Sequence, residues 1–144
     1  MNQRVLSVII GRGPDPSTIR QSVAAKYPNS IVQTLSVEAA TNRFYIEMIA
    51  AQTLSANETP SLLARKPEVD LLLRFAGTTQ ISRAIRQMGA RKGKEFILVI
   101  AGPSRELANL SGEDLGGREL GVGSLSQKEL DRIETAALLN ASTA

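Results

Sequence analysis

The sequence predicts a mixed α/β fold in a single domain, with a central sheet of about four strands packed against helices. A chain of 144 residues with 42% apolar content is long enough to bury one proper core. Short β-branched runs bounded by glycine and proline predict strands, and longer runs with apolar residues at helical spacing predict helices. No repeat or long linker divides residues 1–144, so one domain is expected over the whole chain.

Three runs predict the main strands of this sheet: Arg4 to Ile10, Ser30 to Val37 and Glu95 to Ala101. The third run is apolar almost without interruption, which is typical of a strand buried on both faces. We therefore expect residues 95–101 to lie in the centre of the sheet. A further short strand is expected near Leu120, within a glycine-rich stretch.

Helix signals separate these strands. Asp15 or Ser17 can cap a helix that has Pro16 in its first turn and stops near Tyr27. Residues 67–76 fit either a helix or a buried strand, but Pro67 at the start and Gly77 after the end favour a helix. The other expected helices are Glu38 to Leu54, Thr79 to Met88, Ser104 to Leu110 and Ser126 to Asn140, with a loop at 55–60.

The helix at 79–88 carries an apolar stripe with i, i+3, i+4, i+7 spacing. Its members are Ile81, Ala84, Ile85 and Met88. We expect the isoleucines and the methionine to be buried against Leu72 and Leu73 of the preceding helix. Arg83 and Arg86, three residues apart, then lie together on the outer face.

The composition excludes several kinds of chemistry. The chain contains neither Cys nor His, so thiolate nucleophiles, disulfides, the usual zinc sites and imidazole bases are all ruled out. Acid pairs such as Glu113 with Asp114 stand in no setting typical of a catalytic carboxylate. We expect no catalytic site, no metal and no cofactor. No apolar run reaches the ~20 residues of a membrane span, and the start is unlike a signal peptide, so a cytoplasmic protein is expected.

Six cations without an acid stand out in the segment 71–94, LLLRFAGTTQISRAIRQMGARKGK. They are Arg74, Arg83, Arg86, Arg91, Lys92 and Lys94. Residues 1–94 carry thirteen Lys/Arg against six Asp/Glu, whereas residues 95–144 carry four against eight. Such a basic face suits phosphates or an acidic partner. For Arg74 a local ion pair is an open alternative, because Asp70 lies four residues earlier.

Other functions compete with this interpretation. The run IIGRGPDPST places a glycine turn before a helix, as phosphate-binding loops do, but Pro16 stands where a third glycine belongs and no Walker lysine follows. A plain turn is favoured, and a small enzyme that holds a phosphorylated ligand at 11–13 stays the alternative. A DNA-reading helix-turn-helix around Gly77 would need apolar residues at 83 and 86, where this chain has arginine, so DNA reading is not expected. A protein-binding scaffold whose basic patch contacts an acidic subunit also remains open.

The segment from Asp70 to Ala90 resembles the PRPK-binding (TPRKB-type) subunits of the KEOPS complex, in their archaeal form. The matching positions are Leu71, Leu72, Gly77, Gln80, Ile81, Ala84, Ile85, Gly89 and Ala90. The likeness is most specific over residues 68–101 and extends more loosely to 38–54 and 137–139. Asp70 stands where the family usually has Glu. Thr79 stands where an archaeal relative often has a basic residue, so no RNA contact is assigned to it.

The resemblance implies a non-catalytic role in a mixed α/β domain. Such subunits bind the PRPK-type kinase/ATPase subunit and through it join the transferase that makes threonylcarbamoyladenosine in tRNA. Archaeal members also recruit tRNA by its single-stranded CCA end. On this basis the expected tRNA contacts are the six cations of 71–94 together with Gln80, and the remaining apolar faces are left for the kinase subunit.

Overall fold

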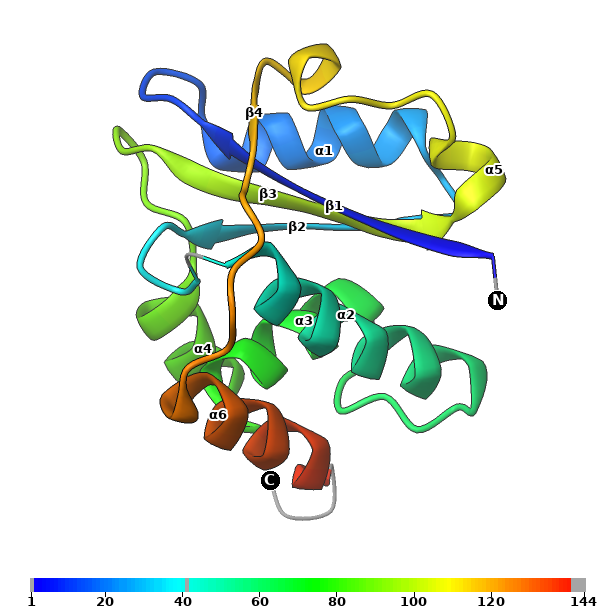
Figure 1. Cartoon of the computed structure of the whole chain (residues 1–144), viewed down its shortest axis with the longest axis vertical. Coiled ribbons are helices and arrows are strands. Elements are labelled where there is room, and N and C mark those ends of the chain that lie inside the picture. The colour runs from blue at the N-terminus through cyan, green and yellow to red at the C-terminus, as the bar shows by residue number, and fades with distance from the viewer. Residues whose placement is uncertain (1, 41, 141–144) are drawn as a thin grey trace.

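The computed structural model describes residues 2–40 and 42–140, which form a mixed α+β fold in a single domain, as expected. Within these residues a four-stranded antiparallel sheet has the order β2-β3-β1-β4. The strands are β1 (Gln3–Ile10), β2 (Ile31–Ser36), β3 (Phe96–Pro103) and β4 (Gly117–Glu119). Helices cover both faces of the sheet, with α1 and α5 on one face and α2, α3, α4 and α6 on the other (Figure 1).

The helices follow the predicted order, with boundaries that differ by a few residues. They are α1 (Pro16–Lys26), α2 (Arg43–Glu58), α3 (Pro67–Ala76), α4 (Ile81–Met88), α5 (Ser104–Leu107) and α6 (Gln127–Leu138). A 3₁₀ turn, η1 (Glu113–Leu115), precedes β4. The choice of helix over strand for residues 67–76 is confirmed, since α3 has those bounds and ends at Gly77 in the left-handed conformation.

The strand predicted to be central is central. β3 pairs with β1 on one side and β2 on the other. Its side chains alternate between two cores, as a strand with helices on both faces requires. Ile97, Val99 and Ala101 pack toward α2 and α3, whereas Phe96, Leu98 and Ile100 pack toward α1 and α5. The sheet thus forms the middle layer of three.

Helix α2 begins five residues later than expected and ends four residues later. The reason lies at Asn42, whose side chain accepts the Phe44 backbone N–H at 2.9 Å and so caps the helix at Arg43. The same side chain binds the backbone of Gly123 and Ser124, which ties the chain before α6 to the start of α2. Residues 55–58, expected in a loop, continue the helix.

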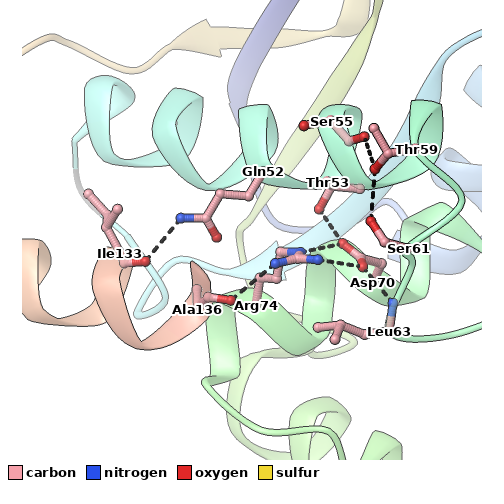
Figure 2. A network of polar contacts seen from close by, with 10 residues as sticks. All are labelled: Gln52, Thr53, Ser55, Thr59, Ser61, Leu63, Asp70, Arg74, Ile133 and Ala136. Carbon is pink, nitrogen blue, oxygen red and sulfur yellow. Dashed lines mark hydrogen bonds and ion pairs between the residues drawn. The ribbon is translucent and has the colours of Figure 1, made fainter. Parts of the chain in front are cut away.

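A buried polar network joins α2, α3, α6 and the loop before α3 (Figure 2). The Asp70 carboxylate accepts hydrogen bonds from the Thr53 hydroxyl at 2.6 Å and the Leu63 backbone N–H at 2.9 Å. It also forms a two-point ion pair with Arg74, at 2.7 and 3.1 Å. Arg74 in turn donates to the carbonyl of Ala136 at 3.1 Å. Four segments are therefore held together by one carboxylate and one guanidinium.

Candidate nucleic-acid interface

Helix α4 presents its isoleucines to solvent. Ile81 is 48% exposed and Ile85 is 57% exposed, whereas Ala84 is fully buried and Met88 is half-buried. The expectation that both isoleucines lie in the core is therefore wrong. The small Ala84 side chain lies on the face that packs into the core, and the isoleucine ridge beside it is turned outward. Leu72 and Leu73 of α3 are buried, as expected.

The exposed isoleucines border an open groove of about 470 Å³. Its walls are the start of α1, the edge strand β2, the start of α3 and the outer face of α4. The apolar lining consists of Pro16, Val69, Leu72, Ile81, Ile85 and Ala90, together with Gly89. The polar and charged lining consists of Asp15, Ser17, Arg20, Gln33, Thr34, Lys66, Glu68 and Lys92.

Gln33 holds two walls of this groove together. Its amide nitrogen donates to the carbonyl of Glu68 on α3 at 2.8 Å. Its amide oxygen accepts the backbone N–H of Thr34 at 2.9 Å. Because β2 is an edge strand, backbone groups that face away from β3 need such partners. The groove is thus lined by fixed polar groups on one side and by exposed apolar side chains on the other.

Five of the six predicted cations are exposed. Arg83 and Arg86 are exposed on α4, and Arg91, Lys92 and Lys94 are exposed in the turn that leads to β3. Lys92 lines the groove itself. Within the part of the chain that the structure describes, none of the five lies within 4.0 Å of a carboxylate oxygen. Their charges remain available to an anionic partner.

The sixth cation, Arg74, is not part of this surface. Its side chain is buried in the ion pair with Asp70 and in the contact with the Ala136 carbonyl. The local pairing that the i, i+4 spacing allowed is the one that forms, so Arg74 is removed from the candidate contacts. Gln80 is exposed at the residue before α4 and stays among them.

The sequence did not indicate three further cations that line the groove or the smaller hollow next to it. Arg20 of α1 and Lys66 before α3 line the groove. Arg12 of the β1–α1 loop lines a smaller hollow beside Arg91 and Lys94. These residues contribute to the excess positive charge of residues 1–94, but no local pattern indicates that their loops meet the α4–β3 turn.

The glycine loop at 11–13 is a poor phosphate cradle. The residue before α1 is Asp15, and its carboxylate accepts a hydrogen bond from the Thr18 hydroxyl at 3.0 Å. A negative charge at this position occupies the helix end that would otherwise attract a phosphate. Among residues 2–40 and 42–140, no three acidic side chains are grouped as metal ligands.

A second groove, of about 750 Å³, lies between α2, the chain leading to α3 and the end of α6. Met48, Leu62, Leu63, Ala137 and Leu139 provide much of its apolar lining. Leu138, next to this lining, is 75% exposed, and Met48 is 39% exposed. The network of Asp70 and Arg74 lies beside this groove, since Arg74 also lines it.

Comparison with known proteins identifies no relative: no family model matches this chain, and no curated protein matches it either. No helix in the described part of the chain combines the length and apolar character needed to cross a bilayer.

Proposed function

We propose that this chain is a cytoplasmic, non-catalytic KEOPS accessory subunit that holds the CCA end of tRNA in the α4 groove. One observation carries the proposal. Ile81 and Ile85 are exposed in a groove that Lys92 also lines, and neither Lys92 nor the exposed Arg83 and Arg86 of the same helix region forms an ion pair in the described chain. A single-stranded RNA end offers the matching chemistry, because its unstacked bases are apolar on their faces and its phosphates are anionic.

Each part of the groove has a role in this proposal. The isoleucine side chains contact base faces in place of aromatic rings, since no aromatic residue is among the described residues that line the groove. Gln33 and Thr34 offer polar groups to base edges. The cations contact phosphates and so add affinity without selecting a sequence.

The second groove is proposed as the contact for the PRPK-type kinase/ATPase subunit, through which the chain joins the threonylcarbamoyl transferase subunit. Eight of the thirteen residues that line it are apolar, and Leu138, the chain neighbour of the lining residues Ala137 and Leu139, is 75% exposed. An apolar surface of this kind is typical of a protein contact. The two partners then bind different sides of the helical layer.

The test of the RNA contact is the double variant Arg83→Glu with Arg86→Glu. It is expected to weaken binding to all tRNA sequences and to flatten the dependence of log K on log salt. The slope should change by about 0.7 for each single-strand phosphate that is no longer neutralised. The matched control is Arg105→Glu with Arg118→Glu, an equal charge change at two exposed arginines on α5 and β4.

The alternative of a protein-binding scaffold predicts a different outcome. In that case the Arg83/Arg86 variant would bind tRNA as wild type does and would lose the kinase subunit instead. Under the present proposal, Leu138→Glu is the variant that loses the kinase subunit in co-purification, while its affinity for tRNA is unchanged. The pair of variants therefore assigns each surface to its partner.

A further inference from the structure

Three loops meet at one end of the sheet (Figure 1). Their residues line a hollow of about 200 Å³. Arg12 comes from the β1–α1 loop, and Arg91 and Lys94 come from the α4–β3 turn. Ser36 at the end of β2, Val37, Glu38 and Glu95 complete the lining. The cations belong to segments about eighty residues apart in the chain, so only the fold brings them together.

The charges of this hollow favour an anion. All three cations are exposed, and in the described residues none lies within 4.0 Å of a carboxylate, although Glu38 and Glu95 are also part of the rim. Arg91 is held in place, because its guanidinium donates to the carbonyl of Arg86 at 3.2 Å at the end of α4. An arginine fixed at one side can present its other N–H groups to phosphate oxygens.

The hollow is separate from the α4 groove but adjoins it. Lys92 lines the groove, and its chain neighbour Arg91 lines the hollow. The hollow has few apolar side chains in its lining, so it offers nothing to unstacked bases and only charge to a backbone. In a tRNA, the chain that leads out of the single-stranded end enters the duplex of the acceptor stem.

We propose that Arg12, Arg91 and Lys94 form a second contact, which binds backbone phosphates of the acceptor-stem duplex while the α4 groove holds the single-stranded end. This inference rests on the proposed function. In this proposal two parts of the protein surface bind the RNA. The apolar α4 groove binds the unpaired end, and the charged hollow binds the stem beside it. Arg12, which lies in the loop that resembles a phosphate-binding turn, thereby acquires a phosphate partner through its side chain.

The experiment measures two RNAs against three forms of the full chain. The RNAs are intact tRNA and a short single-stranded oligonucleotide that ends in CCA. The protein forms are wild type, Arg12→Glu with Lys94→Glu, and the control Arg105→Glu with Arg118→Glu. Arg91 is left unchanged because it also caps α4. Arg12→Ala with Lys94→Ala serves as a milder second variant if the charge reversal lowers stability.

The Arg12/Lys94 variant is expected to bind tRNA about tenfold or more weakly than the control variant, with a salt slope smaller by about 1 for each phosphate that is no longer neutralised. Its affinity for the oligonucleotide should match that of the control. Equal weakening for both RNAs, or no weakening for tRNA, overturns the stem contact and leaves the groove proposal standing. If wild type binds neither RNA, the proposed function fails as well.

Discussion

Ile85 exposes 57% of its surface, although its neighbour Ala84 is completely buried. A side chain that is already in water contributes little to folding, so we predict that Ile85→Ala changes the free energy of unfolding by no more than about 0.5 kcal/mol. Ala84→Leu is the matched test of the buried face and should cost about 1–3 kcal/mol, because it overpacks the core. Urea unfolding measures both. A loss of about 2–5 kcal/mol for Ile85→Ala would place that side chain in the core.

Asp70 is the residue on which the buried network depends, because it binds Thr53, Leu63 and Arg74. Asp70→Asn is expected to lower the free energy of unfolding by about 3–5 kcal/mol, because Arg74 would remain buried without its counter-charge. Glu68→Gln, on the same turn of α3, is the control and should cost less than about 1 kcal/mol. If the two variants lost equal stability in urea unfolding, the buried ion pair would have no special role.

At the scale of elements, α5 is fastened to the start of β2 by one carboxylate. Glu106 accepts hydrogen bonds from the Ser30 hydroxyl at 2.7 Å and from the Asn29 side-chain amide at 2.9 Å. The hydrogen bond from Ser30 has the largest effect and lowers the pKa of Glu106 below its ordinary value of 4.5. Burial, the next largest effect, opposes this, and the hydrogen bonds from Asn29 and the charge of Arg105 add to the lowering of the pKa. The ionised carboxylate is thus the form that the fold favours.

The sign of the pH dependence follows from this lowered pKa. Stability from Glu106 is fully present above pH 4.5 and is lost as the pH falls through the lower folded-state pKa. We predict that Glu106→Gln reduces the difference in unfolding free energy between pH 7 and pH 3, as measured by urea unfolding at each pH. An identical pH dependence in wild type and variant would show that the contact contributes nothing.

The residue patterns predicted where helices and strands lie along the chain better than they predicted which face of each element is buried. The β-branched runs and the Pro67 and Gly77 signals located the strands and α3 to within a residue or so, because these are local properties. The start of α2 was missed, since it depends on Asn42, which also binds Gly123 some eighty residues away. The face of α4 was missed because Ala84 and the isoleucines belong to one stripe, and periodicity does not say which part of a stripe is covered.

At the scale of the whole molecule, the fold forms two grooves and brings cations from several loops to the α4 groove and to the hollow beside it. The sequence indicated Arg91, Lys92 and Lys94 among those cations, and it also included Arg74, which is buried in its ion pair with Asp70. It could not indicate the contributions of Arg12, Arg20 and Lys66, because their places depend on which loops meet in space. Under the proposed function, the two grooves would bind a nucleic acid and a protein partner at the same time.

The central claim is that the α4 groove holds the unpaired 3′ end of tRNA, and a four-way binding comparison tests it most directly. Wild type and Ile85→Glu are each titrated with intact tRNA and with tRNA that lacks its CCA end. Removal of the end should weaken binding to wild type but make little difference to the variant, because both changes remove the same contact. If removal of the CCA end weakened binding to wild type and to Ile85→Glu by the same factor, the groove would not be where that end binds.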